Sequence, residues 1–134
     1  MANPSKAKGT RAETNVVLYL NSHGLRAERR PLAGSADQGD LRVILPDGTE
    51  VTAEVKAGRQ TQNYPRSKVE DWRKQALVEA ENSGCPMSML IIVRYKRRLR
   101  DTEVWLPNDQ WFDETTPGWT MMYLDEFARW KGEM

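Results

Sequence analysis

Cysteine and histidine are almost missing from this chain. Its 134 residues include one of each, Cys85 and His23. A single cysteine cannot form a disulfide within the chain, and it has no second cysteine with which to build a zinc site. His23 falls at the expected C-terminal end of the first helix, where a positive charge favours the helix dipole, so we interpret it as structural.

Long apolar runs and glycine-rich phosphate loops are missing as well. No stretch is long enough for a signal peptide or a membrane-spanning helix, and together with the lone cysteine this predicts a cytoplasmic protein with no membrane partner. Neither G-x-x-x-x-G-K-[ST] nor G-x-G-x-x-G occurs. The length fits one domain, residues 1–134, with its own core.

The net charge is only +1, but the charged residues are unevenly distributed. Residues 1–30 hold six lysines and arginines against two acids, and residues 94–100 hold five basic residues and no acid. From Asp101 onward, eight acids accompany two basic residues. This polarity is expected of a chain that meets phosphates on one face. The run 94–100 has a second interpretation, a solvated turn whose charges discourage aggregation.

Residues 41–56 have the pattern of a β-hairpin. An apolar run leads into the turn sequence Pro46–Thr49, after which polar and apolar residues alternate. Because side chains alternate across a strand, Glu54 and Lys56 share one face of the second strand. In this register Asp40 lies opposite or diagonal to Glu54. The bland alternative is an ordinary ion pair on an exposed strand face.

A third carboxylate belongs to Glu13, near the start of a helix expected from Thr10 to His23. Residues 1–9, which are small, polar and basic, should form a flexible arm before it. Thr10 and Glu13 fit a capping box, which is a structural role. Glu13 also lies on the apolar stripe that should face the sheet, together with Val16, Val17 and Leu20. Leaving an inward carboxylate unpaired costs about 3 kcal/mol or more, so a metal site is an attractive partner.

Converging carboxylates favour a hard divalent cation. Like charges a few ångströms apart raise one another's pKa values, and a dication with oxygen ligands removes that cost. Mg²⁺ or Mn²⁺ suits a site of two or three acids without histidine, because such ions keep several waters and bind substrate phosphate. With Lys56 orienting water or offsetting phosphate charge, the residues predict phosphodiester hydrolysis.

The order and spacing of these residues resemble the PD-(D/E)XK nucleases. The shared features are Glu13 on the first helix, R-x-x-x-G-S-x-x-x-x-D at residues 30–40, and E-V-K at residues 54–56. The resemblance covers about residues 5–95 and is greatest to Holliday junction resolvases of the archaeal type and their phage relatives. It implies a restriction-endonuclease-like α/β (α+β) fold, in which helices flank a mixed central sheet in the order α-β-β-β-α-β-β. For a phage protein, the location would be the host cytoplasm.

The resemblance also assigns roles to residues. Asp40 and Glu54 would bind the metal together with the carbonyl group of Val55, Glu13 would complete the site, and Lys56 would be the catalytic lysine. Gly39 stands where the family name has proline, but the chemistry does not require proline there. Ser35 would lie near the scissile phosphate, and Gln75 matches a helix glutamine of exonuclease relatives. With Ser35, the residues expected to contact DNA are Lys6, Lys8, Arg11, Arg29 and Arg30.

The remaining sequence predicts further strands and helices. We expect strands at residues 25–30, 87–93 and 102–106, and a second helix at residues 67–82 that opens with a capping box. Its buried stripe should consist of Val69, Trp72, Ala76, Leu77 and Ala80. Trp72 is expected in the core rather than as a platform for base stacking.

The C-terminal extension, residues 107–134, is rich in aromatic residues and holds three of the five tryptophans. A short strand at residues 119–123 and a helix at residues 124–131 are expected within it. The extension either packs against a second subunit or caps the sheet.

These patterns lead to three hypotheses about function. The first is a Mg²⁺- or Mn²⁺-dependent endonuclease that cuts branched DNA as a homodimer, since two sites would cut two strands symmetrically. The second keeps the metal site but acts on DNA ends, flaps or nicks. The third is a non-catalytic DNA-binding or assembly protein with a vestigial site, against which the complete set of acids and lysine argues.

Overall fold

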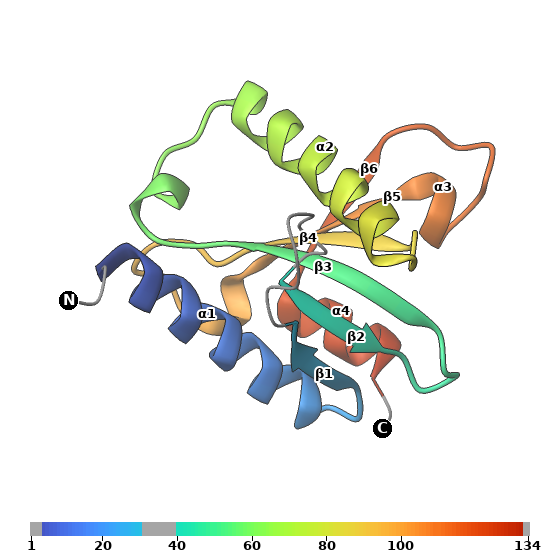
Figure 1. The fold of residues 1–134 in the computed structure, drawn as a ribbon, viewed down its shortest axis with the longest axis horizontal. Coiled ribbons are helices and arrows are strands. Elements are labelled where there is room, and N and C mark those ends of the chain that lie inside the picture. The colour runs from blue at the N-terminus through green and yellow to red at the C-terminus, as the bar shows by residue number, and fades with distance from the viewer. Residues whose placement is uncertain (1–3, 31–39, 133–134) are drawn as a thin grey trace.

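The computed structural model describes residues 4–30 and 40–132, and only the backbone of residues 4–10. These residues form a mixed α/β fold in which a six-stranded sheet is flanked by helices (Figure 1). The elements are α1 (Pro4–Asn21), β1 (Arg26–Arg29), β2 (Leu41–Ile44), β3 (Glu50–Lys56), the 3₁₀ turn η1 (Arg59–Thr61), α2 (Arg66–Ser83), β4 (Ser88–Ile92), the 3₁₀ turn η2 (Leu99–Asp101), β5 (Glu103–Pro107), α3 (Asn108–Trp111), β6 (Trp119–Tyr123) and α4 (Leu124–Lys131).

The strands lie in the order in which they occur along the chain, β1 to β6. Neighbouring strands are antiparallel except β3 and β4, which are parallel and are joined by α2. Leu41 pairs with Ala53, so β2 and β3 form the predicted hairpin in the predicted register. The predicted order of helices and strands is therefore confirmed, and β6 and α4 follow at the predicted positions.

Each face of the sheet has its own core. On one face, the odd-numbered residues of β3 pack against α1 and α4, in a cluster that includes Val16, Leu20, Val51, Ala53, Val55, Leu124 and Phe127. On the other face, Trp72 and Ala76 of α2 pack against Leu90 and Ile92 of β4. Figure 1 shows α2 on one side of the sheet, with α1 and α4 on the other. Glu54 and Lys56, the other set of β3 side chains, therefore face α2.

Helix α1 begins earlier than predicted. It starts at Pro4, so residues 4–9 have helical backbone instead of forming the expected flexible arm, and Thr10 lies within the helix rather than capping it. Proline is tolerated in the first turn of a helix, and an interior glycine such as Gly9 costs only about 1 kcal/mol. Gly9 therefore does not mark the start of the helix, contrary to the prediction from sequence.

Helix α2 differs from its prediction at its start and along its stripe. Its N-cap is Pro65, without a side-chain capping bond, so the capping box expected at Ser67 and Glu70 was wrong. Leu77 is 37% exposed, whereas Glu79 is buried. The helix turns Glu79 inward because it lies three residues beyond Ala76 on the same face. The Nε2 group of Gln75 donates a hydrogen bond to Glu79, which reduces the cost of burying it.

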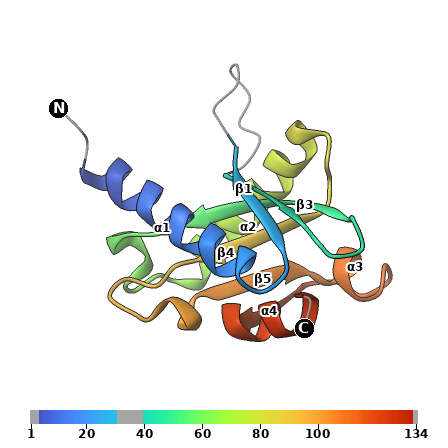
Figure 2. The ribbon, with the colours of Figure 1, turned by 90° about the horizontal axis from the view of Figure 1, so that it is seen from below.

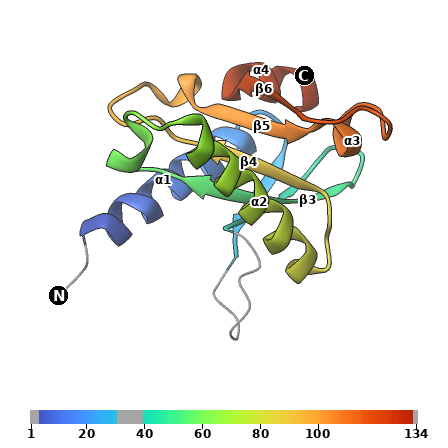
Figure 3. The ribbon, with the colours of Figure 1, turned by 90° about the horizontal axis from the view of Figure 1, so that it is seen from above.

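The C-terminal extension caps the sheet. Leu124 and Phe127 of α4 are completely buried, and the indole of Trp111 donates a hydrogen bond to the Ser88 carbonyl oxygen. Figures 2 and 3 show α4 lying along β5, with α3 at the end of that strand. The rings of Phe112 and Trp130 stack on each other and remain exposed. The homodimer stays a prediction.

Within residues 4–30 and 40–132, no helix is both long enough and apolar enough to cross a bilayer.

Candidate active site

Asp40 is held between β1 and β3 just before β2 begins. Its carbonyl oxygen accepts a hydrogen bond from the Arg30 amide, and its own amide donates to the Ala53 carbonyl oxygen. The Asp40 side chain turns toward β3, where the Val55 amide donates to its Oδ2 atom over 2.8 Å. The carboxylate thus reaches the residue between Glu54 and Lys56, as the hairpin register predicts.

Glu54 and Lys56 form a largely buried ion pair beneath α2. The Lys56 Nζ atom lies 3.4 Å from Glu54 Oε1, and the two side chains are only 15% and 6% exposed, Lys56 being the more exposed. Lys56 also donates to Gln75 Oε1 over 2.8 Å. The structure therefore brings Gln75 into direct contact with the candidate lysine.

Glu13 approaches the site from α1. Its side chain is 17% exposed, and its Oε2 atom lies 3.0 Å from the Arg29 Nε atom. Burial raises the pKa of Glu13, and the negative charge of Asp40 raises it further, while Arg29 acts in the opposite direction. The Glu13 and Asp40 carboxyl groups thus interact electrostatically, so the helix and the hairpin bring their acids to the same place.

An oxygen-rich donor set at this place fits Mg²⁺ or Mn²⁺. In the part of the chain that the structure describes, the buried Oε2 atom of Glu54 has no hydrogen-bond partner, which is costly unless a cation meets it. Within the same residues, no group of three or more Asp, Glu, His or Cys side chains is arranged to hold a metal ion. The acids at this place that could hold such an ion are Asp40 and Glu54, with water in the remaining positions, and the Val55 carbonyl group stays a ligand that the resemblance implies.

Of the residues expected to contact DNA, the three whose side chains the structure describes have different surroundings: one is exposed on α1, and two contact other side chains. Arg11 is exposed on α1, and Arg29 pairs with Glu13. The guanidinium of Arg30 lies against the Thr52 hydroxyl group, 3.4 Å away. Ser35 lies outside the described residues, as do the side chains of Lys6 and Lys8.

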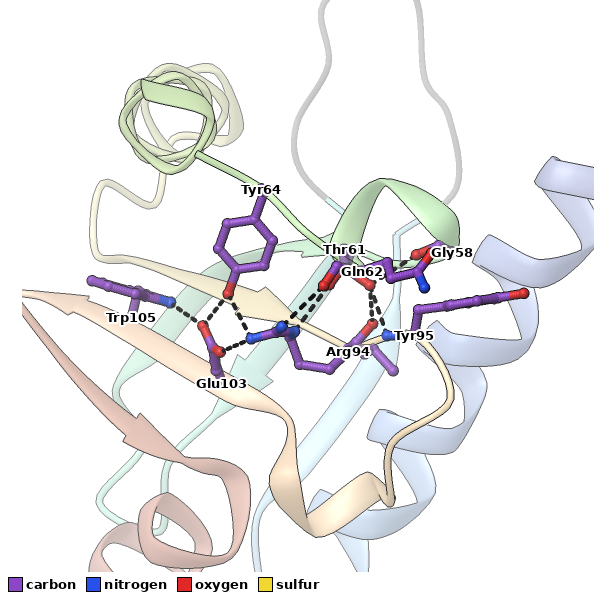
Figure 4. A network of polar contacts seen from close by, with 9 residues as sticks. Gly58, Thr61, Gln62, Tyr64, Arg94, Tyr95, Glu103 and Trp105 are labelled. Carbon is purple, nitrogen blue, oxygen red and sulfur yellow. Dashed lines mark hydrogen bonds and ion pairs between the residues drawn. The ribbon is translucent and has the colours of Figure 1, made fainter. Parts of the chain in front are cut away.

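A buried polar network next to the site was missed by sequence reasoning. Arg94 forms an ion pair with Glu103, with 2.8 Å between Nη1 and Oε2 (Figure 4). The Glu103 Oε1 atom accepts hydrogen bonds from the hydroxyl of Tyr64 and the indole of Trp105. Burial raises the pKa of Tyr64, and the bond to Glu103 adds to this effect. The sequence did contain a signal: Glu103 and Trp105 lie on the same face of the predicted strand, because they are two residues apart on either side of Val104.

The same arginine anchors the segment that follows Lys56. Arg94 donates from Nε to the Thr61 carbonyl oxygen and from Nη2 to that of Gln62. The Tyr95 amide donates to the hydroxyl of Thr61, a residue that is completely buried. Residues 57–64 are thus tied to the end of β4, as Figure 4 shows.

Comparisons with known proteins do not place the chain in a family. No protein-family model matches it, and the search of curated proteins found no match.

Proposed function

We propose that this protein is a metal-dependent endonuclease of the PD-(D/E)XK type that hydrolyses phosphodiester bonds in branched DNA, as Holliday junction resolvases do. The observation that carries the proposal is the meeting of Asp40, Glu54 and Lys56 across one hairpin. The amide of Val55, which lies between Glu54 and Lys56 in the strand, donates to the Asp40 carboxylate, and the Lys56 Nζ atom lies 3.4 Å from Glu54 Oε1. The mixed sheet flanked by helices is compatible with a restriction-endonuclease-like core.

Each residue has a role in this proposal. Asp40, Glu54 and the carbonyl group of Val55 hold Mg²⁺ or Mn²⁺, which when bound makes water more acidic and stabilises charge on the phosphate. Lys56, oriented by Gln75, donates a hydrogen bond to the attacking water or to a phosphate oxygen. Glu13 completes the acidic cluster beside Asp40.

Two substitutions test the assignment. Glu54→Ala and Lys56→Ala should each abolish cleavage of a synthetic four-way junction in Mg²⁺ while junction binding remains measurable. The matched controls are Glu50→Ala, at the exposed start of the same strand, and Lys74→Ala, on the exposed side of α2. Full activity in both site variants would refute the proposal.

The choice of DNA substrate needs a separate comparison. Rates on a four-way junction, a flap, a nicked duplex and a linear duplex should be measured under identical conditions. A strong preference for the junction supports a resolvase, whereas a preference for flaps, nicks or ends supports the second nuclease hypothesis.

One observation favours the non-catalytic alternative. The described residues contain no ready-made group of three metal-binding side chains. Calorimetric titration with Mg²⁺ or Mn²⁺ separates the two cases, because a functional site releases or absorbs heat that Asp40→Asn removes. If the protein shows neither heat of ion binding nor cleavage, the result indicates a DNA-binding protein with a vestigial site.

A further inference from the structure

A basic groove lies beside the candidate active site, with a volume of about 400 Å³. Three segments line it: the middle of α1, the two residues after β3, and the loop after β4. Its lining residues are Arg11, Ala12, Asn15, Ala57, Gly58, Val93, Arg94, Tyr95, Lys96 and Arg97. Figure 4 shows the Tyr95 ring extending from the loop toward α1.

The groove begins where the candidate site ends. Ala12 immediately precedes Glu13, and Ala57 immediately follows Lys56. Because β3 and β4 are parallel, their C-terminal ends open at the same edge of the sheet. A ligand that extends from the site along this edge enters the groove.

The groove presents positive charge from both of its walls. Arg11 on α1 and Lys96 and Arg97 on the opposite loop are exposed, and the lining residues within 4–30 and 40–132 include no acid. The charge of Arg94 is balanced by Glu103. Three solvent-facing cations divided between two walls suit a chain of phosphates better than a single small anion.

The loop that carries two of these cations is held in place. The Tyr95 amide is bonded to the buried Thr61, and the Arg97 amide donates to the Arg94 carbonyl oxygen. Lys96 has a φ of 58°, and its Nζ atom lies 5.4 Å from the centre of the Tyr95 ring. Positively charged groups on an anchored loop lose less conformational entropy when they bind a ligand.

We propose that this groove binds the phosphodiester backbone of the DNA strand next to the cleaved bond, with Arg11, Lys96 and Arg97 as the residues that neutralise its phosphates. The inference rests on the proposed nuclease function and assigns a strand path to it. Arg11 was already a candidate DNA-binding residue, but the run 94–100 had two interpretations. The proposal gives Lys96 and Arg97 a binding role, while Arg94 belongs to the buried network.

The test measures the salt dependence of DNA binding. Lys96→Gln with Arg97→Gln removes two groove charges and keeps much of each side chain. The matched control, Arg26→Gln with Arg129→Gln, removes two exposed charges elsewhere, since Arg26 lies at the end of β1 far from Asp40. Affinity for a duplex and for a four-way junction is measured by fluorescence anisotropy in EDTA at several salt concentrations, and unfolding midpoints establish that each variant folds.

The double variant Lys96→Gln with Arg97→Gln, called the groove pair, should flatten the slope of log affinity against log salt by about 1.8. This is about 0.9 for each phosphate on duplex DNA that the variant no longer neutralises. The control double variant should leave the slope unchanged. Arg11→Gln, on a different element, should flatten the slope by about 0.9. These changes would support the groove. If the groove pair has the same slope as the control while the wild-type protein cuts DNA in Mg²⁺, the binding role of the groove is refuted and the nuclease function is not. A wild-type protein that neither binds nor cuts DNA overturns both.

Discussion

The Nζ atom of Lys56 lies 2.8 Å from Oε1 of Gln75, so the strand that carries the candidate lysine is tied to the helix above it. Glu54 holds the same ammonium group from within the strand. Gln75 is oriented in turn by its bond to Glu79. The position of the lysine therefore depends on two different elements of the fold.

Replacing Gln75 with alanine should slow cleavage about tenfold to hundredfold, because a small displacement of a reacting group has effects of this size. Gln75→Glu keeps an acceptor for Lys56 but cannot donate to Glu79 and places a second carboxylate beside it, so it should recover only part of the rate. Lys74→Ala, one residue away on the exposed side of α2, is the control. Single-turnover cleavage of a four-way junction measures all three, and an unchanged rate in Gln75→Ala would remove the residue from the site.

Mg²⁺ or Mn²⁺ should raise the stability of the folded protein. A ligand that binds only the folded state adds about 2.7 kcal/mol at a concentration about 100 times its dissociation constant. Glu54→Ala should abolish the gain, while Glu70→Ala, on the exposed part of α2, should retain it. Thermal unfolding at increasing ion concentration measures the effect, and an equal gain in Glu54→Ala would show that the ion binds elsewhere.

Arg94→Ala should destabilise the protein by about 3 to 5 kcal/mol, because it leaves the buried Glu103 carboxylate without its positively charged partner. Arg98→Ala breaks an exposed ion pair with Asp101 and should cost less than about 1 kcal/mol. Urea unfolding of both variants gives the comparison. Similar losses in the two would mean that burial of the Arg94 pair has little energetic weight.

Tyr64 should make stability depend on alkaline pH. Its pKa is raised above the ordinary value of 10.0 by burial and by its bond to Glu103. A group with a raised pKa in the folded state contributes stability that is full below its unfolded pKa and is lost as pH rises through the folded value. The difference in unfolding free energy between wild type and Tyr64→Phe should therefore shrink above about pH 10. A difference that does not change with pH would contradict this.

The dimer prediction requires a surface substitution rather than a truncation. Removing the chain after Leu106 would take away Leu124 and Phe127, which are completely buried. Phe112 and Trp130 stack in the open, with 5.3 Å between their ring centres. Phe112→Ser with Trp130→Ser should convert a dimer into a monomer, as measured by light scattering. A wild-type protein that is already monomeric refutes the homodimer.

Local pattern was sufficient for much of the fold. The turn at Pro46–Thr49 determined the pairing of Leu41 with Ala53, and this pairing placed Asp40 near Glu54. The continuous apolar run of β4 indicated a strand buried on both faces, which is confirmed. These predictions succeed because turn geometry and side-chain alternation depend on residues close together in the sequence.

Interactions between distant segments could not be predicted in the same way. Arg94 looked like one of several surface cations, and only the folding of β5 beside β4 brings Glu103 to it. Gln75 was connected with the site only through the family resemblance, and its contact with Lys56 depends on the parallel pairing of β3 and β4, which sets α2 above the lysine. Helix propensity alone also failed to show that α1 continues through Gly9.

Thr61 is completely buried, and its bonds to Arg94 and Tyr95 hold the stretch that leaves the site. The entropy of ordering this stretch is lost when the protein folds, not when a nucleic acid arrives. One wall of the site is thus already in its final shape before binding. Under the proposed nuclease function, accommodation of differently branched DNA would have to come from bending of the DNA itself or from parts of the protein that Thr61 does not restrain.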